Sequence, residues 1–287
     1  MAHEHPHPDG QMKHQIADEW KAYWQGQAHM PAWDYTSQIV LEVLRASIGS
    51  IAETAVLEAG CGTGRISLAL ARAGAQVSCI DISPEAAALA KRLFGESRIP
   101  LQVSVASLFE LPFPSGRFDV VWNAGVLEHF SESERADALR ELLRVVKSGG
   151  LVITLNPYRF AGLYQLGKWL AERAGKWPYG HEDPVATLAP ASAGLLCRAW
   201  KERSVGFYVI LIESLRVSRL FLPLVRGLRA GFVWLHRSRL GGFLRWTDRV
   251  LCRLFGGYLL VSVFRKVPPE EPVAGREQPT PEAAAVS

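Results

Sequence analysis

The sequence predicts an α/β fold built on a doubly wound, mainly parallel sheet. Between residues 54 and 157, short apolar runs that suit buried strands alternate five times with segments that suit helices. Three glycines follow the first of these runs, and an aspartate ends the second. Alternating strands and helices form parallel sheets with helices on both faces, and ligands bind beyond the carboxyl ends of such strands.

The individual elements follow from local signals. Strands are predicted at residues 54–59, 75–81, 101–106, 118–124 and 151–156, and helices at 18–24, 37–48 and 65–73. Ser83 followed by Pro84, and Ser131 with Glu134 three residues later, are N-cap patterns that start two further helices. Residues 147–150 are expected to end the second of these helices, and residues 205–212 to form a sixth strand.

The composition favours a cytoplasmic protein. Of the 287 residues, 48% are hydrophobic, which is enough for a sizeable core. The four cysteines are widely separated and form no CxxC pair, which favours a reducing compartment over a disulfide framework. We expect neither a secretory signal nor a membrane-spanning helix, because no apolar leader and no run of 18 apolar residues is present.

Both ends are expected to be disordered tails. Residues 1–14 are polar and rich in histidine, and residues 267–287 are rich in Pro, Glu and Ala. One domain is expected between them, over residues 15–266. Its core is predicted at 50–157, and a substrate-covering region with an amphipathic insertion at 158–256.

The glycine-rich turn predicts a nucleoside site. Gly60, Gly62 and Gly64 alternate with other residues, and glycine lets the backbone turn sharply and approach a ligand closely. Asp81 ends the next strand, 21 positions after the first glycine, where a carboxylate can accept both hydroxyls of a ribose. The alternative is an ordinary turn between strand and helix with an aspartate at the surface.

Two residues separate this pattern from a dinucleotide site. A dinucleotide-binding turn has the form GxGxxG and places a pyrophosphate at the helix N-terminus, whereas position 65 here is Arg. Glu58 stands beside the turn, where it would repel a pyrophosphate but suit a positive ammonium or sulfonium group. A dinucleotide-dependent oxidoreductase is therefore disfavoured.

Together these motifs resemble those of the class I S-adenosylmethionine-dependent methyltransferases, in particular the small-molecule group typified by ubiquinone and menaquinone biosynthesis. The segment "VLEAGCGTG" is similar to the family's first motif, residues 110–130 to its "LPF…FDVV…LEH" stretch, and residues 143–157 to the stretch around its fifth strand. The resemblance implies a Rossmann-like sheet of seven strands whose last strand, near 256–266, is antiparallel. It also implies an N-terminal helical lid and a helical insertion before the last strand.

The resemblance further implies S-adenosylmethionine as the cofactor. Asp81 would take the ribose hydroxyls, Ile82 would pack on the adenine, and Ser107 would accept from the adenine amino group where many relatives have an acid. The implied cofactor-binding residues are Glu58, Gly60, Cys61, Gly62, Gly64, Asp81, Ile82, Ser107, Leu108, Asn123 and Ala124.

Methyl transfer from a sulfonium needs alignment, exclusion of water and, for some acceptors, a base. His129, Tyr158 and His181 are the candidate catalytic residues, although each also suits an ordinary structural role. Glu182 stands beside His181 in the same polar loop. Ubiquinone-type relatives carry an extra acid where this chain has Gly125, so no metal site is expected.

The C-terminal third carries a basic, apolar insertion. Residues 198–266 contain 14 Lys and Arg against three Asp and Glu, a net charge of +11 in a chain whose total is +4. Between 216 and 237, apolar residues such as Leu224 fall on one side of an ideal helix and arginines such as Arg229 on the other. Pro223 and Gly227 favour two short helices over one straight helix. Residues 213–253 are expected either to meet an anionic membrane or to pack as a cap over a greasy substrate pocket.

The expected function is methyl transfer to a small, hydrophobic or lipid-linked metabolite, in the cytoplasm or at the inner face of the membrane. A catalytically silent domain that serves as a membrane or partner adaptor remains the alternative. Methylation of RNA or protein is a further alternative, although nucleic acid is disfavoured as a partner because no RNA-binding module is visible.

Overall fold

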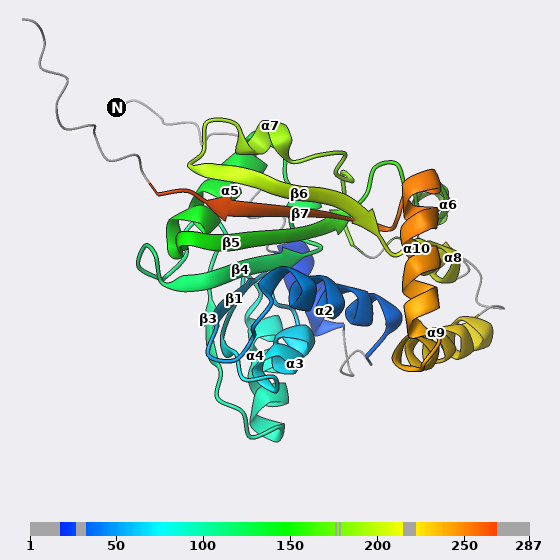
Figure 1. The fold of residues 1–287 in the computed structure, drawn as a ribbon, viewed down its shortest axis with the longest axis horizontal. Helices are drawn as coiled ribbons and strands as arrows, with labels where there is room; N and C mark the ends of the chain where they lie inside the picture. Colours follow the sequence, from blue (N-terminus) through cyan, green and yellow to red (C-terminus); the bar gives the residue numbers. More distant parts are fainter. Residues whose placement is uncertain (1–17, 27–32, 176, 178, 215–221, 269–287) are drawn as a thin grey trace, which may run out of the picture.

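A computed structural model describes residues 18–26, 33–175, 177, 179–214 and 222–268. Within these residues, seven strands form one sheet in the order β3-β2-β1-β4-β5-β7-β6 (Figure 1). Strands β1 to β5 pair in parallel, while β7 runs antiparallel to both β5 and β6. The predicted doubly wound sheet with an antiparallel last strand is confirmed. The predicted tails fall outside the described residues, apart from residues 267 and 268.

The strands are β1 (Ala55–Ala59), β2 (Gln76–Asp81), β3 (Gln102–Val105), β4 (Phe118–Ala124), β5 (Val146–Pro157), β6 (Cys197–Val205) and β7 (Leu259–Lys266). The helices are residues 18–25, α2 (Tyr35–Ile48), α3 (Arg65–Ala71), α4 (Pro84–Glu96), the short 3-10 helix η1 (Leu127–His129), α5 (Glu132–Val145), α6 (Gly162–Arg173), α7 (Ala189–Ser192), α8 (Phe207–Ser214), α9 (Leu222–Arg237) and α10 (Gly241–Phe255). The five strands predicted before residue 157 are confirmed to within a few residues at most ends.

The two predicted N-caps are confirmed in atomic detail. The Ser83 hydroxyl accepts from the Ala86 amide at 3.3 Å, with Pro84 in the first turn of α4. Ser131 and Glu134 form a complete capping box at the start of α5. These caps accept hydrogen bonds from backbone amides that would otherwise have no partner at a helix N-terminus.

The sheet separates two apolar cores. On one face, Leu44 of α2 packs in one cluster with Val56 and Trp122 of the sheet, and α3 and α4 join them. On the other face, Leu139 and Leu142 of α5 pack against the opposite sides of the same strands. The strands β1, β2, β4 and β7 are therefore largely buried on both faces, which explains their apolar sequences, whereas β3 is partly exposed.

The structure corrects two predicted elements. Residues 205–212 do not form a strand, because β6 ends at Val205 and α8 begins at Phe207. Gly206 has a φ of +81°, and Asp248 of α10 accepts from the amides of Gly206 and Tyr208 at 3.2 and 3.3 Å. The cap therefore comes from a residue some 40 positions away, which the local apolar run does not reveal. Residues 147–150 do not end α5 either; they already belong to β5.

The insertion is also different from the prediction. Pro223 stands in the first turn of α9, where proline is tolerated, and Gly227 lies inside that helix without ending it. Leu224 is exposed, while the partly buried Leu228 and Phe232 pack on the core. The predicted amphipathic residues 215–221 lie outside the described part of the chain.

Helix α9 is anchored to α2. The rings of Phe232 and Tyr35 are 5.2 Å apart, and Nε2 of the buried His236 lies 2.6 Å from Oε1 of Glu42. Tyr35 is therefore a core residue. Figure 1 shows α6, α8, α9 and α10 gathered at one end of the sheet, where Pro157 of β5 pairs with Leu259 directly after α10. This end holds the carboxyl ends of the parallel strands.

Candidate cofactor and acceptor site

A cavity of about 900 Å³ opens beyond the carboxyl ends of the parallel strands. Its wall combines the turn after β1, the ends of β2 and β4, the helix at residues 18–25, and parts of α6 and α9. This volume lies toward the upper end of the range typical of small-molecule sites. The cavity is therefore large enough for a cofactor together with a small acceptor.

The glycine turn forms a cradle beside the cavity that leaves no room for a side chain at Gly60 or Gly62. Gly60 and Gly62 have φ values of +88° and +51°. A Cβ at Gly60 would lie 2.7 Å from Cγ2 of Val126, and one at Gly62 would lie 2.8 Å from Cζ2 of Trp24. Both glycines are needed for their backbone conformation and for the close approach of these two side chains.

Asp81 joins this turn to the turn after β2. Its Oδ2 accepts from the Gly62 amide at 2.8 Å, and its Oδ1 accepts from the Ser83 amide at 2.9 Å. Burial raises the pKa of Asp81, while the Ser83 and Gly62 amides lower it. Each carboxylate oxygen still has a second lone pair, so the group can accept further hydrogen bonds from a ligand.

Glu58 is a buried acid that Ser67 and the charge of Arg65 compensate only in part. Its Oε2 has no hydrogen-bond partner among the described residues. Burial, with a smaller contribution from the negative charge of Asp81, raises the pKa of Glu58 to about 8. A cationic group in the cavity would favour the ionised carboxylate and lower this pKa.

Comparisons with known proteins identify the family. A family described as a methyltransferase domain matches residues 57–154. The ubiquinone biosynthesis O-methyltransferase of Xanthomonas campestris pv. campestris (strain B100) is 31% identical over 166 residues, covering 52% of this chain and 69% of the relative. Its counterpart in Xanthomonas oryzae pv. oryzae (strain PXO99A) is 28% identical over 207 residues, covering 66% and 84%. The chain belongs to the class I S-adenosylmethionine-dependent methyltransferases.

A solved structure supports the fold of this methyltransferase. The geranyl diphosphate C-methyltransferase from Streptomyces coelicolor A3(2) superposes with a TM-score of 0.60 at 15% identity, covering 88% of this chain and 98% of that one. At this identity the likeness concerns the fold alone.

The cavity fits S-adenosylmethionine, which supplies an electrophilic methyl group on a sulfonium when bound. The Gly60–Gly62 cradle admits a ligand close to the backbone, and the orphaned oxygen of Glu58 offers a negative partner beside it. Asp81 keeps lone pairs for ribose hydroxyls. Ser107 lines the wall, and its hydroxyl accepts from the Phe109 amide at 3.2 Å, so it must share its oxygen with any adenine contact.

The structure brings most of the predicted residues together. The cavity is lined by Glu58, Gly60, Cys61, Gly62, Asp81, Ile82, Ser107, Leu108, Ala124 and His129. Gly64, Asn123, Tyr158 and His181 are not part of the lining. A Cβ at Gly64 would lie 3.3 Å from that of Ala90, so this glycine allows close packing of α3 on α4. Asn123 is fully buried within the sheet.

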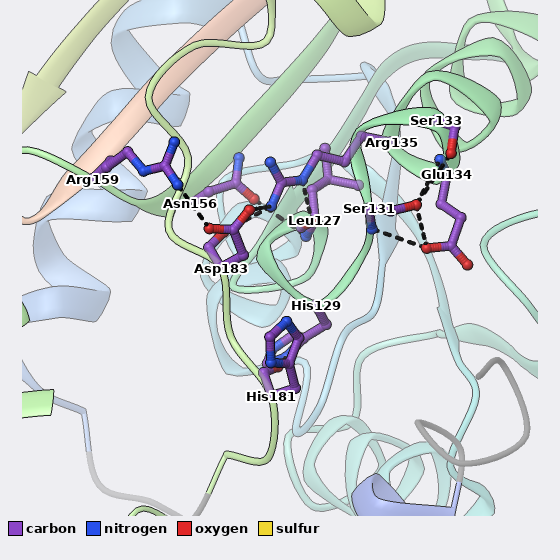
Figure 2. A network of polar contacts seen from close by, with 10 residues as sticks. All are labelled: Leu127, His129, Ser131, Ser133, Glu134, Arg135, Asn156, Arg159, His181 and Asp183. Atoms are coloured by element: carbon purple, nitrogen blue, oxygen red, sulfur yellow. Dashed lines mark hydrogen bonds and ion pairs between the residues drawn. The ribbon is translucent and has the colours of Figure 1, made fainter. Parts of the chain in front are cut away.

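His129 is held by the loop that contains His181 (Figure 2). Its Nδ1 lies 2.7 Å from the His181 carbonyl oxygen, so Nδ1 carries the proton and Nε2 keeps its lone pair. Burial lowers the pKa of His129 and so favours the neutral ring. Nε2 lies 3.9 Å from Oε1 of Glu128, too far for a hydrogen bond. Within the described residues, no group of three or more His, Cys, Asp or Glu is placed to hold a metal ion.

Sequence reasoning missed much of the outer wall. Tyr164, Tyr179 and Tyr258 line the cavity, as does Arg229, which was expected on the solvent side of its helix. The lid is the helix at 18–25, whose Trp20 contacts His129 edge-on at 5.2 Å and whose Trp24 covers Gly62. The aromatic residues near position 24 were a signal for this lid, but the tyrosines come from segments without a motif.

The Glu58→Gln variant should change how stability depends on pH. The folded-state pKa of about 8 lies above the ordinary value of 4.5, so the folded state holds a proton that the unfolded state releases between these values. The free energy of unfolding of wild type therefore falls as pH rises through this window. Glutamine does not titrate, so the variant does not lose this stability. The free energy of unfolding of the variant minus that of wild type should therefore increase by on the order of 3 kcal/mol from pH 5 to pH 8.

Urea unfolding of both proteins at the two pH values measures this gain. The exposed Glu110→Gln is the matched control and should show no gain. An equal difference in the free energy of unfolding between Glu58→Gln and wild type at both pH values would contradict the raised pKa of Glu58.

Proposed function

We propose that this methyltransferase transfers the methyl group to a small hydrophobic or lipid-linked acceptor. The observation that carries the proposal is the aromatic wall of the cavity beyond the glycine cradle. Trp20, Tyr23, Phe130, Tyr179 and Tyr258 all line it. Aromatic side chains offer a large apolar surface with few polar atoms, which suits a greasy ring or chain.

The helices around the cavity support the same acceptor class. Tyr164 of α6 lines the cavity, while Leu163 and Leu166 of the same helix are exposed on its outside. Apolar side chains therefore continue from the cavity wall to the surface. The Xanthomonas relatives are named for ubiquinone biosynthesis, which supports a prenylated hydroxybenzene as the first acceptor to test.

Acceptor activity should rise with the length of the hydrophobic chain. Hydroxybenzenes that carry zero, one, two or three isoprene units can be compared in a methyl-transfer assay. Each unit that is buried should raise kcat/KM at least tenfold until the cavity is filled, because tenfold needs only about 1.4 kcal/mol and about 0.8 kcal/mol is gained for each buried carbon of the five-carbon unit. If the unprenylated compound is the best acceptor, the hydrophobic acceptor class is wrong.

We propose further that α10 binds an anionic membrane surface. Phe243 and Trp246 are 66% and 55% exposed and stack on each other with ring centroids 6.0 Å apart. At about 100° per residue, Arg249 and Arg253 fall beside them on the outer face of the helix. Both arginines are exposed. Adjoining aromatic and basic stripes are typical of helices that lie in a membrane interface. Across the described residues, no helix has the length and apolar character needed to cross a membrane.

Vesicle sedimentation tests this surface. At low salt, the protein should bind phosphatidylglycerol-containing vesicles and not pure phosphatidylcholine. The double variant Arg249→Glu with Arg253→Glu should lose at least tenfold in partitioning, since each basic residue contributes about 1 kcal/mol near such a surface. Phe243→Ser with Trp246→Ser should also weaken binding.

Arg92→Glu on α4 and Leu196→Ser, both exposed and away from α10, are the controls. Binding that is equal on both vesicle types, or lost equally in the controls, would show that α10 serves only as part of the cap.

A further inference from the structure

Two buried carboxyl groups from distant segments line the same cavity. Glu128 of η1 and Glu182, which follows α6, both line the wall and are only 3% and 6% exposed. The Oε2 atom of each has no hydrogen-bond partner among the described residues. The other oxygen of Glu182 accepts from the Tyr164 hydroxyl at 2.6 Å. Such groups are costly to bury, so their retention points to a ligand that donates to them.

A polar network holds these two segments together (Figure 2). The Asp183 amide donates to the Glu128 carbonyl at 2.8 Å. Arg135 donates to the carbonyl of Leu127 at 2.9 Å and to the carbonyl of Asp183 at 2.7 Å, and it pairs with the Asp183 carboxylate at 3.3 Å. The loop around Glu182 is therefore held in place through its neighbour Asp183, while the Glu182 carboxyl group uses one oxygen for Tyr164 and keeps Oε2 without a partner among the described residues.

The local charges decide which carboxyl group is the proton acceptor. Within the described chain, no Lys or Arg forms an ion pair with Glu128 or Glu182. Burial, followed by the charge of Glu182, raises the pKa of Glu128 well above its ordinary value. Burial also raises the pKa of Glu182, but Tyr164 and Lys168 oppose that rise. Glu128 therefore keeps its proton more strongly, and Glu182 is the one of the two that ionises more readily and can accept a proton.

We propose that Glu182 accepts the proton of a hydroxyl group on the acceptor, so that this enzyme methylates oxygen. The inference rests on the proposed transfer to a small hydrophobic acceptor and names its reacting group. The acceptor oxygen forms a bond to the methyl carbon as the carbon–sulfur bond breaks with its electrons going to sulfur, and the hydroxyl proton passes to Glu182. An ether, a neutral thioether and a neutral carboxyl group result.

The same pair disfavours an amine acceptor. An amine takes a methyl group only in its unprotonated form, and an ionised Glu182 beside it would favour the ammonium ion. A hydroxyl group retains its proton at neutral pH and loses it as the new bond forms. A positioned base raises the rate of such a step by about 10²- to 10⁴-fold.

Glu182→Gln is the test, with para-hexylphenol, its ortho-difluoro derivative and hexylbenzene as probes. With para-hexylphenol, kcat should fall about 100-fold while the affinity for S-adenosylhomocysteine stays at the wild-type value. The more acidic difluorophenol needs less help from a base, so the variant should methylate it within about tenfold of wild type. A structural defect would lower both rates equally. The exposed Glu96→Gln on α4 is the matched control.

Calorimetry on protein loaded with S-adenosylhomocysteine gives a second readout. Para-hexylphenol should bind wild type at least tenfold more tightly than hexylbenzene, and the difference should disappear in Glu182→Gln. Equal binding of the two probes to wild type, or full activity of Glu182→Gln beside an inactive His129→Gln, would overturn the role of Glu182. If neither probe binds wild type, the hydrophobic acceptor class itself fails, and the proposal fails with it.

Discussion

The carboxylate of Asp81 joins the two turns on which the whole site depends. One oxygen accepts from the Gly62 amide and the other from the Ser83 amide, so the turns after β1 and β2 share one buried anchor. Because these hydrogen bonds occupy one lone pair on each oxygen, the cavity keeps a charged acceptor without leaving it uncompensated. The positive-φ glycines, the lid over Gly62 and the cap of α4 are all arranged around this anchor.

The helices α6, α8, α9 and α10 gather at the same end of the sheet as the cavity. Helix α9 packs on α2 through Phe232 and His236, and it also brings Arg229 into the cavity wall. Helix α10 caps α8 through Asp248 and turns its aromatic and basic residues outward. One insertion therefore closes the cavity on its inner side and presents an apolar surface on its outer side. A hydrophobic acceptor that arrives from a membrane would meet both.

The parts of the structure that sequence predicted well depend on short-range signals. The glycine turn, Asp81 and the capping box of Ser131 are each defined within about 25 residues, and the structure places them as predicted. The strand expected at 205–212 is a helix because Asp248 caps it from 40 positions away. Glu182 and Tyr164 come together in the cavity wall only because the loop after α6 is held against η1. This long-range contact leaves no local sequence pattern.

The most direct test of the central claim is calorimetric titration with S-adenosylhomocysteine on wild type, Asp81→Ala and the exposed control Asp137→Ala. The account predicts micromolar binding to wild type and to the control. It predicts a loss of about 1.5–3 kcal/mol, or roughly 10- to 150-fold in Kd, for Asp81→Ala, because charged hydrogen bonds to the ribose are lost. Circular dichroism should show that all three proteins are folded. Folded wild-type protein that does not bind the compound would contradict the assignment of this cavity to the cofactor.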